Sequence, residues 1–210
     1  MVLEPPDTLL DALAWLDLGG VALFALTGAV VAARAGQTFV TLAFLALATG
    51  VGGGSVRDVL IGAPVFWIRD PWVAAVCLLA ALVAWFTPTR WWEGKLVDLA
   101  DGLGMTGFAV FGASKALSYG VTPVPAIIMG VFTGCVGGII RDVLIGRPSI
   151  LLRPEIYVTA AALSASLCVL GELASLPTAL VWTIAVGCGF ALRAAAIMRN
   201  IGLPAYRDRG

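Results

Sequence analysis

Long apolar stretches separated by short polar breaks run along almost the whole chain. A helix needs about 20 apolar residues to cross a hydrocarbon core of roughly 30 Å. Seven stretches reach or approach this length, and the breaks between them are rich in Gly, Pro and charged residues. The pattern predicts an all-α polytopic membrane protein with a single membrane domain over residues 1–210. The seven predicted transmembrane helices cover residues 17–34, 38–62, 70–88, 97–117, 122–146, 154–172 and 176–198.

The chain also repeats itself after 84 residues. Residues 17–64 align with residues 101–148 without a gap, and 21 of the 48 pairs are identical. The densest match is the sequence Arg-Asp-Val-Leu-Ile-Gly, which occupies residues 57–62 and again residues 141–146. Self-similarity at a fixed spacing indicates a duplicated structural unit. We therefore divide the chain into repeat unit one (15–93), repeat unit two (97–175) and an accessory helix (176–198).

Each repeat unit contains three predicted spans. Because three is odd, the second unit enters the membrane from the side opposite to the first. The two units are therefore predicted to be inverted and related by a pseudo-two-fold axis in the membrane plane. The expected fold is seven transmembrane helices, arranged as two inverted three-helix repeats plus one accessory C-terminal helix.

Small residues are concentrated in the second helix of each unit. Glycine in a helix interior costs about 1 kcal/mol relative to alanine, so we expect these two helices to kink or break. Broken backbone at membrane depth is tolerated where it lines a wet cavity, and its free carbonyl groups suit a cation. Close helix packing through small residues is the alternative. The candidate pore-lining or helix-break residues are Thr49, Gly50, Gly52, Gly53, Gly54, Ser55, Thr133, Gly134, Gly137 and Gly138.

Two Arg-Asp pairs follow the glycines, about one helical turn further on. A charge in hydrocarbon is costly, so Arg57, Asp58, Arg141 and Asp142 should face the protein interior. Neighbouring residues on a helix point about 100° apart, which makes pairing within each dipeptide poor. We therefore predict pairs across the inverted repeat, Arg57 with Asp142 and Arg141 with Asp58. The pairs either lock the two helices together or take part in conduction, and the sequence leaves both roles open.

Three further charged residues lie near span ends. Lys115 is near the end of the fourth span, where a lysine side chain can reach the lipid–water interface. Alternatively, Lys115 moves within the transmembrane field, where an elementary charge is worth about 2.3 kcal/mol per 100 mV. Asp17 and Asp101 occupy equivalent positions at the start of the first helix of each unit. We interpret them as charges that complement the helix dipole, with attraction of cations as the alternative.

Composition agrees with a membrane protein and excludes several function classes. The chain is 60% hydrophobic and 12% charged, whereas a soluble domain carries about 25% charged residues. Its net charge is zero, so it lacks the basic surface of a nucleic-acid-binding protein. It has no histidine, and its four cysteines form no Cys-x-x-Cys pair, so we expect no metal site and no cofactor. With no nucleophile–base pair either, we expect no enzymatic activity.

Basic residues are distributed unequally between the two sides of the predicted bundle. One side holds at most Arg69 and Lys115. The other side holds Arg34, Arg90, Lys95, Arg147, Arg153, Arg199, Arg207 and Arg209. The positive-inside rule therefore predicts a cytoplasmic C-terminus and an outside N-terminus. The N-terminal region carries the acidic residues Glu4, Asp7 and Asp11 instead of the basic start of a signal peptide, so we expect the first span to be retained.

The duplicated motif Gly-Gly-x-x-Arg-Asp-Val-Leu-Ile-Gly-x-Pro, with the three-helix repeat and the extra helix, resembles the bacterial branch of the trimeric intracellular cation (TRIC) channels. The resemblance covers roughly residues 15–198. It implies a homotrimer in the lipid bilayer of the bacterial inner membrane, with a pore in each protomer lined by the second and fifth helices. It also implies conduction of monovalent cations, mainly potassium, with Lys115 as the candidate voltage sensor on the fourth helix.

A secondary transporter of glycine or a similar small solute is the competing interpretation. Inverted repeats with discontinuous helices are as typical of such transporters as of channels. The few carboxylates lie beside arginines, which argues against proton-coupled transport. We rank the channel above the transporter, and both above a membrane module without transport, because such a module would leave the duplicated charges unexplained.

Overall fold

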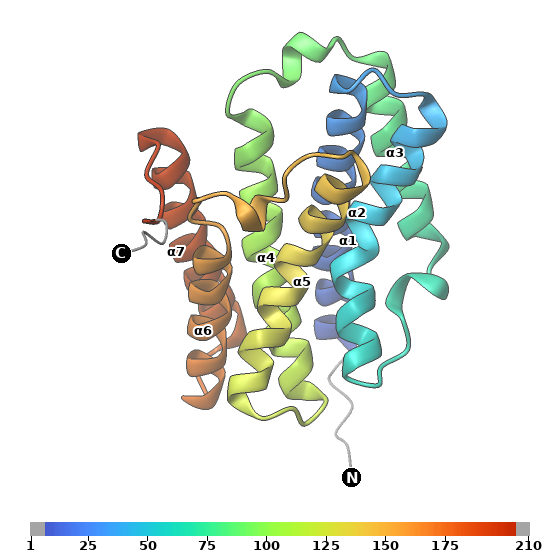
Figure 1. Cartoon of the computed structure of the whole chain (residues 1–210). Coiled ribbons are helices and arrows are strands. Elements are labelled where there is room, and N and C mark those ends of the chain that lie inside the picture. The colour runs from blue at the N-terminus through green and yellow to red at the C-terminus, as the bar shows by residue number, and fades with distance from the viewer. Residues whose placement is uncertain (1–6, 205–210) are drawn as a thin grey trace.

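The computed structural model describes the backbone of residues 7–204 and the side chains of residues 17–204. These residues form seven α-helices and three short 3-10 helices, with one isolated β-bridge (Figure 1). Glu4, Arg207 and Arg209, which bear on the predicted orientation, lie outside the described residues, as do the side chains of Asp7 and Asp11. The helices are α1 (Asp7–Arg34), α2 (Phe39–Leu60), α3 (Pro71–Phe86), α4 (Leu96–Ser118), α5 (Pro123–Leu144), α6 (Val158–Leu173) and α7 (Thr178–Arg199).

The inverted repeat is visible in contacts between equivalent residues. Phe24 of α1 stacks on its own equivalent, Phe108 of α4, with 5.2 Å between the ring centroids. Gly20 faces the ring of Phe108, and its equivalent Gly104 faces the ring of Phe24. Such reciprocal contacts arise when a two-fold axis passes between two antiparallel copies. The predicted fold class, seven helices with two inverted three-helix units, is confirmed.

Four glycines at equivalent positions end the helices of the two units. Gly36 and Gly120 follow α1 and α4 with φ angles of +67° and +77°. Gly62 and Gly146 follow α2 and α5 with φ angles of +69° and +71°. Only glycine adopts this left-handed conformation without a steric penalty, so it ends a helix readily. The chain therefore turns at the same place in both units.

Helices α3 and α6 are shorter than the other five. Each has 16 residues, against 22 residues in α2 and in α5. The predicted spans 70–88 and 154–172 were therefore too long by a few residues. In α3 the difference is spread over both ends, whereas in α6 it lies at the start, where residues 154–157 belong to the connection. A 3-10 turn lies in the connection before each helix, at Phe66–Ile68 in the first unit and at Ile150–Leu152 in the second.

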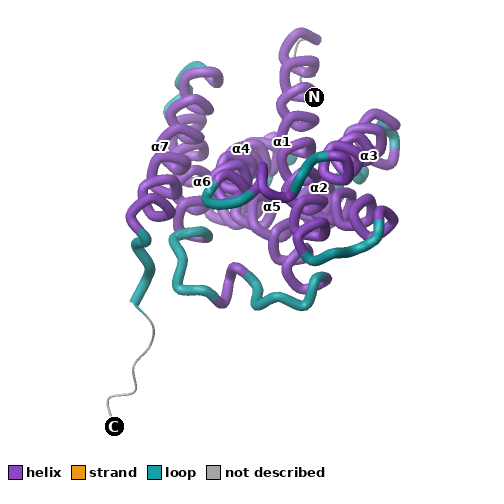
Figure 2. The backbone as a smooth tube through the Cα atoms, turned by 90° about the horizontal axis from the view of Figure 1, so that it is seen from above, coloured by secondary structure: helices purple, strands orange, loops and turns teal. Residues whose placement is uncertain are grey.

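The helices are arranged around a central group made of α1, α2, α4 and α5 (Figure 2). Helix α3 packs on α1 and α2, and α6 packs on α4 and α5. Helix α7 packs on α4 and α6, both of which lie in the second unit. Large apolar side chains are exposed on α2, α3, α5 and α7, among them Phe44, Phe86 and Leu180. An exposed apolar surface of this kind is typical of a protein that faces lipid.

Candidate functional site

The predicted glycine segments meet where α2 crosses α5. A Cβ atom on Gly53 would collide with the carbonyl oxygen of Thr133, and a Cβ atom on Gly137 would collide with the carbonyl oxygen of Thr49. The two contacts are equivalent under the 84-residue repeat. Glycine lets helix backbones approach this closely. The sequence therefore located the place where the two units cross.

The predicted helix break is wrong. Helix α2 is continuous over Phe39–Leu60, and α5 is continuous over Pro123–Leu144. Both helices pass through their glycines with the intrahelical hydrogen bonds in place. The low helix propensity of the glycines is offset because each of them faces a neighbouring backbone or side chain. This close packing adds dispersion contacts. The alternative weighed from the sequence, close packing through small residues, describes these glycines.

The two threonines at the crossing are also used in packing. The Thr49 hydroxyl donates to the carbonyl oxygen of Leu45 at 2.6 Å, and the Thr133 hydroxyl donates to that of Met129 at the same distance. Thr49 packs against Gly28 of α1 and Thr133 against Gly112 of α4, as the repeat requires. Gly50 and Gly134 in turn face the backbone of α1 and α4, respectively. These small residues therefore hold three helix pairs together.

The remaining glycines accommodate side chains from other segments. The space beside Gly54 holds the ring of Phe66, and the space beside its equivalent Gly138 holds the hydroxyl of Tyr157. Gly52 faces Ile140 of α5. Ser55 accepts a hydrogen bond of 2.9 Å from the indole nitrogen of Trp67. All ten predicted residues thus lie at the crossing or beside the connections that lead away from it.

The first charge cluster contains Arg57, Asp58 and Lys115. Asp58 Oδ1 accepts from Arg57 Nε at 2.8 Å and from Lys115 Nζ at 2.8 Å. Arg57 and Asp58 are fully buried, whereas the Lys115 side chain is 19% exposed. The guanidinium of Arg57 also lies over the ring of Phe111, 5.0 Å from its centroid. The Lys115 side chain is therefore directed toward a carboxylate inside the bundle.

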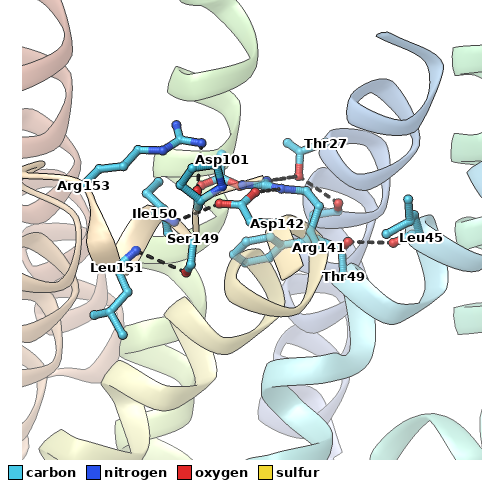
Figure 3. A network of polar contacts seen from close by, with 12 residues as sticks. Thr27, Leu45, Thr49, Asp101, Arg141, Asp142, Ser149, Ile150, Leu151 and Arg153 are labelled. Atoms are coloured by element: carbon cyan, nitrogen blue, oxygen red, sulfur yellow. Dashed lines mark hydrogen bonds and ion pairs between the residues drawn. The ribbon is translucent and has the colours of Figure 1, made fainter. Parts of the chain in front are cut away.

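The second charge cluster repeats this arrangement with different partners (Figure 3). Asp142 Oδ1 accepts from Arg141 Nε at 3.0 Å. Arg141 also pairs with Asp101 of α4 and donates to the hydroxyl of Thr27 on α1 at 3.3 Å. All four side chains are buried. A single guanidinium therefore joins helices α1, α4 and α5.

The predicted cross-pairing of Arg57 with Asp142 and of Arg141 with Asp58 is wrong. Each arginine curls back onto the aspartate next to it, since a long flexible side chain can span the angle between neighbouring positions. The register of the crossing also separates the clusters. Arg57 lies four residues beyond Gly53, Arg141 four beyond Gly137, and the two helices run in opposite directions. At about 1.5 Å per residue, the clusters move apart toward opposite ends of the bundle.

Each aspartate also holds the connection that follows its helix. Asp58 Oδ2 accepts from the backbone N–H of Phe66 at 3.0 Å, and Asp142 Oδ2 accepts from that of Ile150 at 2.9 Å. Phe66 and Ile150 are equivalent residues in the 3-10 turns that precede α3 and α6. A buried carboxylate needs several hydrogen-bond donors, and the turn supplies one of them. The Arg-Asp pairs therefore connect the helix crossing to the connections at both ends.

The two clusters differ in their balance of charge. The first has two basic groups around Asp58, whereas the second has Asp101 and Asp142 around one basic group. Asp17 lies well inside α1, and Asp101 is buried in an ion pair. Our interpretation of these two acids as helix-terminal charges was therefore wrong.

Arg193 and its partners were not predicted from the sequence. Arg193 of α7 is 2% exposed and pairs with Glu155 Oε2 at 2.7 Å. Its guanidinium lies 5.2 Å from the ring centroid of the buried Tyr157. A single arginine inside the predicted span 176–198 was the available signal, since such a residue requires a partner at membrane depth. The partner lies outside the 84-residue identities, in the connection before α6.

The chain is similar to known membrane proteins over most of its length. A family model described as "Glycine transporter" matches it twice, over residues 14–89 and 98–172. The UPF0126 inner membrane protein YadS of Escherichia coli is 34% identical over 204 residues, which are 91% of this chain and 95% of that protein. A UPF0126 membrane protein of Vibrio cholerae is 40% identical over 162 residues, which are 73% of this chain and just under two thirds, 66%, of that protein.

A solved structure has the same arrangement of helices. The TRIC trimeric intracellular cation channel orthologue from Rhodobacter sphaeroides is 37% identical in sequence, with a TM-score of 0.83. The superposition covers 90% of this chain and 99% of that one. The similarity therefore includes both repeat units and the helix that follows them.

Proposed function

This chain belongs to the family that contains the UPF0126 membrane proteins and the bacterial TRIC channels, and we propose that it forms a cation channel. The channel is selective for monovalent cations and prefers potassium. The chain assembles as a homotrimer, and each protomer encloses its own pore along α2 and α5. The observation that carries this proposal is the duplicated crossing of α2 and α5, with a buried ion-pair cluster toward each end.

The proposed path follows the crossing and passes both charge clusters. At the crossing, the carbonyl oxygens of Thr49 and Thr133 lie against glycines of the opposite helix, so the two helix backbones come close together beside the proposed path. Toward one end, the two carboxylates around Arg141 attract cations. Toward the other, the positive charges of Arg57 and Lys115 form a barrier until one of them moves.

Lys115 is the group we propose to move. It is partly exposed, whereas both other members of its cluster are fully buried. When Lys115 leaves, Asp58 keeps its bonds to Arg57 and to the backbone of Phe66, so the cluster stays assembled. Moving one charge across the membrane potential is worth about 2.3 kcal/mol per 100 mV, which makes the position of Lys115 sensitive to voltage.

We propose the bacterial inner membrane as the location of this channel. The N-terminus is outside, and the C-terminus is in the cytoplasm. The distribution of basic residues supports this orientation, because Arg69 stands alone in the α2–α3 connection. Among the described residues, those near the opposite end of the bundle are Arg34, Arg90, Lys95, Arg147, Arg153 and Arg199. A bias of this kind sets the orientation of most polytopic membrane proteins.

Single-channel recording in planar bilayers with a potassium gradient tests the proposal. We expect unitary current steps that reverse near the potassium potential. Lys115→Met removes the charge while keeping the length of the side chain, and should reduce the voltage dependence of opening. Lys95→Met removes the other lysine, which is half-buried directly before α4, and should leave the voltage dependence unchanged.

Secondary transport of glycine or a similar small solute is the alternative outcome. The family model carries the description "Glycine transporter", and inverted repeats occur in transporters as well as in channels. Absence of unitary currents, together with saturable glycine uptake by liposomes that contain the purified protein, would replace the channel with a transporter. Helices α2 and α5 are unbroken, so discontinuous helices support neither the channel nor the transporter in this chain.

A further inference from the structure

The connection between α5 and α6, residues 145–157, is held at both of its ends. Near its beginning, the backbone N–H of Ile150 donates to Asp142 Oδ2 of the second charge cluster at 2.9 Å. Near its end, Arg193 of α7 pairs with Glu155 Oε2 at 2.7 Å and donates to the carbonyl oxygen of Ile156 at 3.3 Å. Helix α7 therefore fixes the segment that leads away from the second cluster.

Arg193 is buried inside the protein. Only 2% of the residue is exposed. Its aliphatic portion lies over Gly102 of α4, where a Cβ atom would come within 2.9 Å of Arg193 Cγ. Its guanidinium faces the ring of Tyr157, 5.2 Å from the centroid. A buried guanidinium with one carboxylate partner depends strongly on that partner, so the position of Arg193 and that of the connection are coupled.

Tyr157 extends this coupling to the second charge cluster. It is 1% exposed and lies directly before α6. Its hydroxyl and Arg141 Nη2 both lie within 4 Å of the same point beside Gly138, at 2.9 Å and 3.7 Å. The ring of this tyrosine thus faces Arg193, while its hydroxyl end lies near the Arg141 cluster.

The first unit lacks this arrangement. The positions equivalent to Glu155 and Tyr157 are Pro71 and Val73, neither of which can form the same contacts. The connection between α2 and α3 is instead held from within its own unit, by the hydrogen bond from Trp67 to Ser55. The α5–α6 connection is therefore held by a residue from outside the repeat units, Arg193 of α7, whereas the α2–α3 connection is held by residues of its own unit.

The segment after α7 is attached to the same connection. Gly202 forms a β-bridge with Glu155, and the backbone N–H of Leu203 donates to the carbonyl oxygen of Pro154 at 2.8 Å. Lys95, just before α4, donates to the carbonyl oxygen of Met198 at 3.1 Å. The end of α7 is thereby joined both to α4 and to the connection, so a movement of α7 is passed on to residues 154–157.

We propose that Arg193 is a positioning residue through which α7 holds the α5–α6 connection closed over the Arg141–Asp101–Asp142 cluster. Glu155 and Tyr157 transmit its effect. When the Arg193–Glu155 pair opens, the connection loosens, and the cluster becomes accessible to ions at that end of the path. The consequence for conduction rests on the proposed channel function, whereas the mechanical coupling does not.

Hydrogen exchange of the purified protein in lipid nanodiscs tests the mechanical part. In Arg193→Gln and in Glu155→Gln, the amides of residues 150–157 should exchange about tenfold faster than in the unaltered protein. The amides of residues 66–70, in the equivalent connection of the first unit, should not change and serve as an internal reference. Arg153→Gln is the matched control, because Arg153 also faces Glu155, at 3.7 Å, but is 41% exposed.

Three results would overturn the inference. They are unchanged exchange at residues 150–157, equal acceleration in both connections, and an effect of Arg153→Gln as large as that of Arg193→Gln. Glu155→Gln is the second variant, because Glu155 is partly exposed and its amide keeps the shape of the side chain. If Arg193→Gln does not fold, acceleration in Glu155→Gln alone still supports the coupling, and its absence rejects it.

Single-channel recording tests the consequence for conduction. Arg193→Gln and Glu155→Gln should each change the open fraction at least threefold and leave the unitary conductance unaltered, because the pair lies beside the path and not in it. The double variant should match the single variants, since both remove the same interaction. Currents that are unchanged from those of the unaltered protein would reject the role in conduction. If the unaltered protein is silent, the channel proposal fails while the exchange result stands.

Discussion

At the scale of single residues, the contacts opposite Gly53 and Gly137 decide how close α2 and α5 approach. Each glycine faces a carbonyl oxygen of the other helix, so neither position has room for a methyl group. Gly107 of α4 is also helical, but a Cβ atom there would meet nothing within 4 Å. An alanine is therefore expected to be unfavourable at Gly53 and Gly137 and harmless at Gly107, so Gly107 serves as a matched control.

Gly53→Ala should destabilise the protein by about 1–3 kcal/mol, because the added methyl group forces the two backbones apart. Gly107→Ala should be neutral or stabilise by up to about 1 kcal/mol, since alanine is the better helix former and no neighbour is displaced. Thermal unfolding in detergent measures both effects. Equal stability of the two variants would mean that the crossing adapts and that glycine is not required there.

The sequence reveals which residues are close to the crossing more readily than it reveals how they pair. The glycines and the Arg-Asp dipeptides stand out by their type and spacing, and the structure places them at the crossing of α2 and α5 or about one helical turn beyond it. The pairing of Arg57 with Asp58 depends on side-chain conformation and on the register of the crossing, which no spacing rule contains. Arg193 was missed because its partner Glu155 lies in a connection, where periodicity has no signal.

At the scale of elements, the two connections that precede α3 and α6 share one backbone contact and differ in the rest. In both, an aspartate accepts a backbone N–H from the 3-10 turn. In the first, Trp67 adds a hydrogen bond to Ser55 of α2. Trp67 therefore has a specific hydrogen-bond partner inside the protein.

Trp67→Phe should loosen the α2–α3 connection and leave the rest of the fold unchanged. Phenylalanine keeps much of the apolar ring but cannot donate to Ser55. Loss of a hydrogen bond of about 1 kcal/mol corresponds to roughly fivefold faster exchange of the amides of residues 66–70. Trp72→Phe is the control, because Trp72 is 69% exposed. Accelerated exchange in residues 150–153 as well would contradict the independence of the two connections.

The elements themselves are largely predictable, because lipid imposes a length and an apolar surface on each helix. All seven helices lie within a few residues of their predicted places, apart from the start of α1. The start of α6 differs most from its predicted place. Residues 154–157 belong to the connection, where Glu155 forms a bridge with Gly202 and pairs with Arg193, and hydropathy has no signal for such contacts.

At the scale of the whole molecule, inversion places equivalent residues on opposite faces of the membrane. Thr38 and Thr122 are equivalent, exposed and located directly before α2 and α5. An impermeant thiol reagent distinguishes them in whole cells when each is changed to cysteine in a Cys188→Ala background, which removes the exposed native thiol. With the N-terminus outside, Thr122→Cys should react in intact cells and Thr38→Cys only after permeabilisation.

The two variants separate the fold from its orientation. Reaction of Thr38→Cys alone in intact cells would keep the inverted repeat but reverse the proposed orientation. Reaction of both from the same side would contradict the inversion itself, and with it the reciprocal contacts of Phe24 with Phe108 across the pseudo-two-fold axis. Because each variant alters one exposed residue in one connection, neither outcome depends on whether the protein conducts ions. The labelling therefore tests the architecture independently of the proposed function.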